Sequence, residues 1–133
     1  ERVKRLILNG ANLNSEGVKP SVQLPIVAGY KLTSLFTKKS PKAQMKADLL
    51  RLMVEEPNIK PEELRELSIK TLVIAGTKDM IKEEHTRLIA DSLPDAELVF
   101  IKGDHFIANK NSLDFNRAVL SFLSLRENSK RSV

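Results

Sequence analysis

Two residues stand out as able to do chemistry together, Asp79 and His105. Each follows an apolar run typical of a buried strand, KTLVIAG at residues 70–76 and ELVFI at residues 97–101. In an open parallel sheet, functional residues gather at the carboxyl ends of the strands. The two residues are 26 positions apart, about one helix plus one strand. This spacing can bring a carboxylate and an imidazole, both able to exchange protons, together on one rim.

The elements around this pair predict an α/β fold. Strand-like runs and helical patterns alternate, at residues 3–8, 70–76, 81–93, 97–101 and 113–125. Strand, helix, strand and helix at these lengths predict a right-handed βαβ unit and a parallel sheet of about three strands. The first run ends in Asn9-Gly10-Ala11-Asn12, which predicts a third loop on the same rim.

The stretch from Leu13 to Leu67 shows no convincing strand. Its apolar spacing predicts helices over residues 22–39 and 43–56, with Pro25 near the first turn of the former. A short helix should begin at Lys60-Pro61 and run to Leu67, because proline and acidic residues occupy its first turn.

Composition excludes several kinds of site. The sequence has no cysteine and only two histidines, so neither a thiolate site nor a zinc site is expected. The net charge is +5, but the lysines between residues 38 and 46 lack interleaved aromatic residues. They predict a solvated face, and we expect neither a nucleic acid nor a membrane as partner. We expect His85 to lie on the surface of the helix over residues 81–93, with Leu88, Ile89 and Leu93 facing inward.

The run from Ile69 to Ile107 resembles the end of an α/β-hydrolase. The family pattern is an apolar strand, Gly-x-x-Asp, a helix closing at Leu-Pro-x-Ala, a second strand, and Gly with histidine shortly after. The matching residues are Gly76, Asp79, Leu93, Pro94, Ala96, Gly103 and His105. The resemblance extends over the chain. Residues 1–12 resemble the core strand that follows the helix behind the family's catalytic nucleophile, together with the loop at the end of that strand. Residues 13–67 resemble a helical lid. Residues 68–133 resemble the carboxyl-terminal βαβα portion that carries the acid and the histidine.

The resemblance implies a cofactor-free catalytic triad. Asp79 would orient His105 and stabilise its imidazolium, and His105 would act as the general base. The sequence contains no Gly-x-Ser-x-Gly, the motif that carries the nucleophile in this family. The parent protein would hydrolyse small ester-like substrates with a serine, or epoxides and haloalkanes with an aspartate. This chain alone is expected to be inactive.

Simpler interpretations stay open for several residues. Asp79 could cap the helix that follows it, and Asp104 could replace it as the acid. Asn12 could contact substrate, although a turn asparagine is the simpler interpretation. Met45, Leu49 and Met53 could line an acyl pocket, but most are expected to pack between helices.

The start of the sequence predicts how the chain associates. A core strand almost at residue 1 indicates a carboxyl-terminal half whose amino-terminal half is missing. That strand should have an unpaired edge, through which the chain would self-associate. We expect a cytoplasmic protein. A nucleotide-binding domain is a third interpretation, but no Gly-x-Gly-x-x-Gly or phosphate-binding loop follows any strand.

Overall fold

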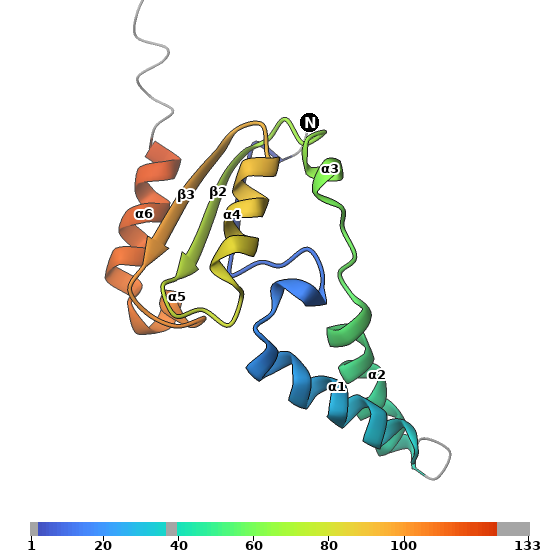
Figure 1. The fold of residues 1–133 in the computed structure, drawn as a ribbon. Helices are drawn as coiled ribbons and strands as arrows, with labels where there is room; N and C mark the ends of the chain where they lie inside the picture. The colour runs from blue at the N-terminus through green and yellow to red at the C-terminus, as the bar shows by residue number, and fades with distance from the viewer. Residues whose placement is uncertain (1–2, 37–39, 125–133) are drawn as a thin grey trace, which may run out of the picture.

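A parallel three-stranded sheet forms the centre of the structure, a computed structural model that describes residues 3–36 and 40–124 (Figure 1). The strands are β1 (Arg5–Asn9), β2 (Lys70–Gly76) and β3 (Ala96–Ile101), in the order β1-β2-β3. All three run in the same direction, so their carboxyl ends meet at one rim. The predicted α/β class with three parallel strands is confirmed.

Helices cover both faces of the sheet. Helix α4 (Glu83–Ser92) lies on one face and α6 (Ser112–Ser124) on the other (Figure 1). A short helix, α5 (Ile107–Lys110), which the sequence did not predict, joins β3 to α6. The expected end of the last helix, Leu125, lies outside the described residues.

The core has two halves, one on each side of β2. Leu72 and Ile74 pack with Phe122 of α6, whereas Val73 packs with Ile89 of α4. All five side chains are at most 1% exposed. A strand buried on both faces needs a continuous apolar run, which explains the sequence of β2.

The region between β1 and β2 is helical. It contains a 3₁₀ turn (Ser15–Gly17), α1 (Pro20–Ser34), α2 (Pro41–Glu55) and α3 (Pro61–Leu64). Each of the three α-helices has proline in its first turn, where the missing N–H has no helical partner. Pro25 therefore lies in the second turn of α1 rather than the first, because the helix begins earlier than predicted. The 3₁₀ turn was not predicted.

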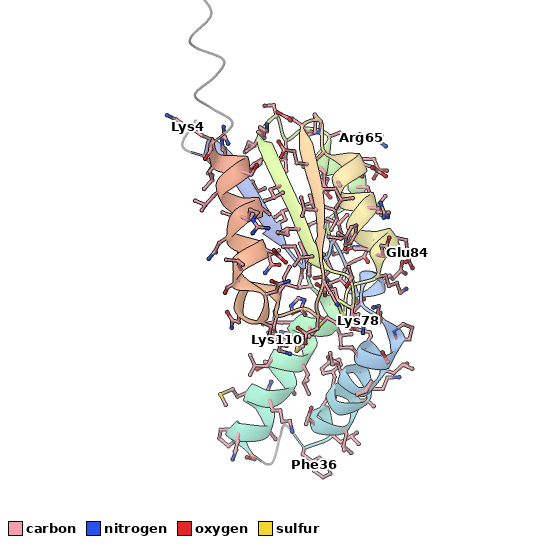
Figure 2. All side chains as sticks on the ribbon, turned by 90° about the vertical axis from the view of Figure 1, so that its left-hand side faces the viewer. Lys4, Phe36, Arg65, Lys78, Glu84 and Lys110 are labelled. Atoms are coloured by element: carbon pink, nitrogen blue, oxygen red, sulfur yellow. The ribbon has the colours of Figure 1, made fainter. Side chains whose placement is uncertain are left out.

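Helices α1 and α2 form a hairpin that projects from the end of the sheet where the strands finish (Figure 1). Figure 2 shows Lys78 and Lys110 at this end, Phe36 near the tip of the hairpin, and Lys4 and Arg65 at the opposite end of the sheet. No described helix is long and apolar enough to cross a membrane.

Candidate active site

Three loops meet at the rim of the sheet. The N–H of Gly10, after β1, donates to the carbonyl of Ile74 at 2.9 Å. The N–H of Lys78, after β2, donates to the carbonyl of Gly103, after β3, at 2.8 Å. The first bond ties the loop after β1 to strand β2, and the second ties the loops after β2 and β3 to each other.

Asp79 lies buried in the loop after β2, with its side chain 2% exposed. Its Oδ1 accepts a hydrogen bond from the N–H of Ile81 at 3.0 Å, and its Oδ2 accepts a long one from Gly76 at 3.4 Å. Backbone donors to both oxygens satisfy a carboxylate that has lost its water. Asp79 does not cap α4, whose N-cap residue is Lys82 and has no side-chain cap. Its carboxylate instead closes the turn that leads to Ile81.

His105 lies against that carboxylate. Its Nδ1 is 2.8 Å from Asp79 Oδ1, and its side chain is 30% exposed. An ionised carboxylate can only accept, so Nδ1 must be the donor of this bond, and in a neutral ring Nε2 then keeps its lone pair. The structure thus brings together the two residues predicted from the sequence, with a basic nitrogen left for proton transfer.

Gly10 is the third residue of this arrangement, and its importance was not predicted. Its φ of +56° is left-handed, and a Cβ there would lie 2.7 Å from His105 Nδ1 and 3.2 Å from Asp79 Oδ2. Only glycine allows the loop after β1 to approach the pair so closely. The Asn-Gly-Ala-Asn turn indicated a loop, but no local signal identified what that loop contacts.

A pocket of about 360 Å³ opens beside His105. Gly10 and His105 form its rim, and apolar side chains of α1 and α2 form much of its wall. Met53 lines this pocket, whereas Met45 and Leu49 do not. All three are at least 52% exposed, so the expectation that most of them pack between helices is wrong for this structure.

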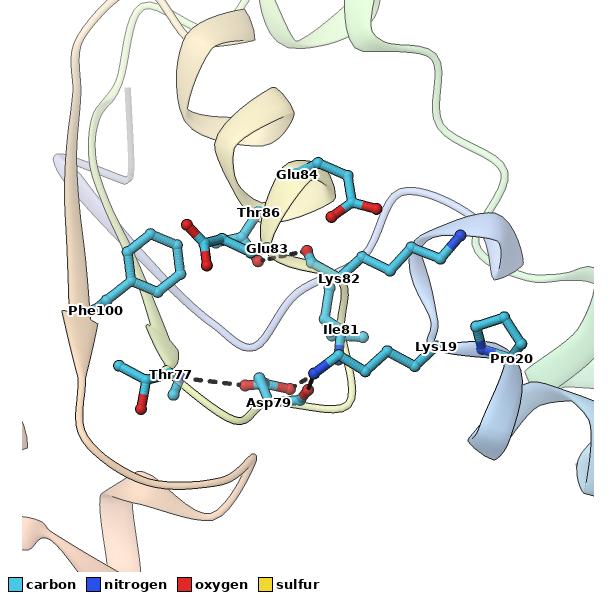
Figure 3. A pocket seen from close by; sticks show the side chains of 11 residues that line it. Lys19, Pro20, Thr77, Asp79, Ile81, Lys82, Glu83, Glu84, Thr86 and Phe100 are labelled. Carbon is cyan, nitrogen blue, oxygen red and sulfur yellow. Dashed lines mark hydrogen bonds between the residues drawn. The ribbon is translucent and has the colours of Figure 1, made fainter.

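A second pocket, of about 380 Å³, is lined by Asp79, Lys19 and Phe100 among others (Figure 3). Lys19, the residue before α1, reaches across it and donates a hydrogen bond from Nζ to the carbonyl oxygen of Asp79. The N–H of Lys19 also donates to Met80 at 2.8 Å. The base of the α1–α2 hairpin is therefore attached to the loop that carries the buried acid.

Asp104 points away from His105. Its carboxylate binds Lys110 and accepts from the N–H of Phe106 at 2.9 Å. The Lys110 ammonium, together with that backbone bond, lowers the pKa of Asp104. The alternative in which Asp104 serves as the acid finds no support in this geometry.

His85 does not lie on the helix surface, which corrects the prediction. It is 8% exposed, and its Nε2 accepts a hydrogen bond from the N–H of Leu13 at 3.0 Å. The segment before α1 covers this side of α4. Ile89 and Leu93 are buried as expected, but Leu88 is 41% exposed, because the buried stripe of α4 passes through His85 and Ile89 toward Leu93, the residue after the helix.

Asn12 donates from its side-chain amide to the carbonyl of Asn14 at 2.9 Å, the contact of a turn residue. It also lines the pocket beside His105. Within the described part of the chain, no three histidine, aspartate or glutamate side chains gather to hold a metal ion.

Solved structures share this arrangement of elements. An enol-lactonase from Burkholderia xenovorans LB400 matches with a TM-score of 0.64 at 16% identity over 92% of this chain. A hydrolase from Pseudomonas aeruginosa PA01 matches with 0.61 at 23% identity, also over 92%. A serine hydrolase involved in carbazole degradation matches with 0.61 at 25% identity over 93%. The chain has the α/β-hydrolase fold.

It holds one part of that fold. The matches cover 57%, 56% and 55% of the lengths of these three proteins, so the chain spans little more than half of each. No protein-family model and no curated protein sequence matches the chain. At these identities the likeness to α/β-hydrolases concerns the fold, and the roles of Asp79 and His105 rest on their geometry.

Proposed function

We propose that this chain supplies the acid and the general base of a hydrolase for esters or similar small acyl substrates. One observation carries the proposal: His105 Nδ1 lies 2.8 Å from the buried Asp79 Oδ1 at the rim of an α/β-hydrolase fold. His105 also lines a pocket, so the pair stands where a substrate could reach its imidazole.

In this mechanism, Asp79 holds His105 in the tautomer with its proton on Nδ1. Nε2 then removes the proton of the attacking hydroxyl, and the buried carboxylate stabilises the imidazolium that results. The proton afterwards passes from Nε2 to the leaving group. No metal or cofactor enters these steps.

The nucleophile and the oxyanion-hole donors would come from residues outside this chain, which contains no Gly-x-Ser-x-Gly. We favour serine over aspartate because one neighbour of similar fold is described as a serine hydrolase. An aspartate in that place would redirect the chemistry to epoxides or haloalkanes. The α1–α2 hairpin would act as the lid, since its helices line the pocket beside His105.

The test compares this chain with the longer protein that contains it, using 4-nitrophenyl butanoate. The chain alone should show no turnover above the uncatalysed rate, because it lacks a nucleophile. The longer protein should hydrolyse the ester, and His105→Ala should lower kcat by roughly 10⁶, as expected for loss of the histidine of a triad. Turnover by the purified chain that survives His105→Ala would contradict the mechanism.

A second candidate function is self-association without catalysis. It is favoured by the position of β1, which pairs with β2 on one side and, among the described residues, with no strand on the other. An open strand edge can pair with a second chain. This candidate concerns the isolated chain and is compatible with the hydrolase proposal for the longer protein.

A further inference from the structure

One residue in the wall of the pocket beside His105 carries a buried amide without a hydrogen-bond partner. Gln23, in the second turn of α1, lines this pocket. Its Nε2 and Oε1 are both shielded from solvent and, among the described residues, neither makes a hydrogen bond. They are the only buried side-chain atoms of the described residues in this condition.

Such a group calls for an explanation, because a buried amide without partners destabilises a fold. Gln44, on α2, shows the ordinary alternative: it is exposed and donates to Asp48 at 3.0 Å. A leucine or methionine at position 23 would continue the apolar wall formed by Val22, Ile26 and Leu52 without this cost.

We infer that Gln23 is a specificity-determining residue, which binds a neutral hydroxyl or amide on the acyl part of the substrate. The inference rests on the proposed function, since it assigns the pocket to substrate. An amide offers one donor and one acceptor on adjacent atoms, and a hydroxyl or carboxamide can satisfy both. Both amide atoms are shielded from solvent in the free chain, so the Gln23 side chain must rotate to turn its amide into the pocket when the ligand binds.

The charge of the pocket argues for a neutral ligand. Glu56 lines the same pocket and would repel a substrate carboxylate. A carboxylate would also leave Gln23 Oε1 without a donor, and an ammonium would leave Nε2 without an acceptor. A purely aliphatic acyl group would leave both atoms unpaired. Sites of this kind discriminate strongly against analogues that lack the polar group.

The test is a binding titration of the 133-residue chain that follows the side-chain amide signal of Gln23 by NMR. The probes are ethyl lactate, ethyl propanoate, which lacks the hydroxyl, and monoethyl succinate, which is an anion. Ethyl lactate should shift the Gln23 amide signal and bind about tenfold more tightly than either of the others.

Gln23→Met should abolish this preference and leave the affinity for ethyl propanoate within about twofold. Gln44→Met, the matched control, should change neither affinity. Equal affinities of the unaltered chain for ethyl lactate and ethyl propanoate would overturn the inference. So would a bound water on the Gln23 amide that ethyl lactate does not displace.

Binding is measured without turnover, so this result does not depend on a nucleophile. A hydroxyl preference in a protein whose longer form fails to hydrolyse esters would refute the proposed function and keep the binding role of Gln23. Ester hydrolysis by the longer protein, without a preference for the hydroxyl ester, would support the proposed function and refute the binding role of Gln23.

Discussion

At the scale of single residues, the account depends on the contact between Asp79 and His105. The position of Asp79 near His105 was predictable, because a parallel βαβ unit places the loops after β2 and β3 on one rim. His85 was not, because its burial comes from the segment around Leu13, 72 residues earlier in the chain. Helical periodicity carries no information on such a distant contact, and the apolar Leu88 pointed to the wrong face of α4.

Asp79→Asn should change the tautomer of His105. An asparagine has a single oxygen, and when its amide nitrogen faces Nδ1 the proton of the ring must move to Nε2. Nitrogen-15 NMR of the imidazole should show the Nδ1–H tautomer in the unaltered chain and a substantial Nε2–H population in the variant. Asp104→Asn is the control and should leave the tautomer unchanged, since Asp104 binds Lys110 and Phe106. An identical spectrum for Asp79→Asn would refute the contact.

His85 should make the stability of the chain depend on pH. Burial, and then the neighbouring Lys82 ammonium, lower its pKa from the usual 6.5, while Glu16 and Glu84 oppose this shift. The unfolded chain therefore binds the proton more readily. The stabilisation is complete above pH 6.5 and is lost as the pH falls below it, until the lowered pKa of the folded state is passed.

Urea unfolding between pH 8 and pH 5 measures this dependence. His85→Gln should remove it, whereas His105→Gln, the control, should retain it. If His85→Gln loses as much stability as the unaltered chain when the pH falls from 8 to 5, groups other than His85 cause the pH dependence.

At the scale of elements, the segment before α1 is attached to the start of α4. Val18 and Ile81 form an antiparallel bridge, and the N–H of Lys82 donates to the carbonyl of Gly17 at 2.8 Å. These contacts couple the α1–α2 hairpin to the loop of Asp79. Apolar spacing predicted α1 and α2, and proline with acidic residues predicted α3. The sequence did not predict this attachment, because it joins loops with no periodic pattern.

Gly17→Ala should loosen this attachment. A Cβ at position 17 would lie 2.4 Å from His85 Cδ2, so the segment or the imidazole must move. Chemical denaturation should show a loss of about 1–3 kcal/mol in the free energy of unfolding. Gly29→Ala, within α1, meets only Leu50 at 3.5 Å and should gain about 0.5–1 kcal/mol. Equal effects of the two changes would contradict the tight contact at Gly17.

At the scale of the whole molecule, the proposed self-association rests on the edge of β1 that pairs with no other described strand. Sedimentation velocity from micromolar to millimolar concentration should show a growing dimer or larger species. Addition of a segment that pairs with the free edge of β1 should abolish this association. A monomer over the entire range would count against self-association, and would leave the hydrolase proposal intact.

The central claim is that Asp79 and His105 serve a nucleophile that lies outside this chain. The most direct measurement is the coding sequence over roughly 150 codons, about one domain, before the codon for Glu1. We predict a strand-rich segment that carries Gly-x-Ser-x-Gly shortly before Glu1. A reading frame that starts near Glu1, with no such segment, would leave the pair without a nucleophile and contradict the claim.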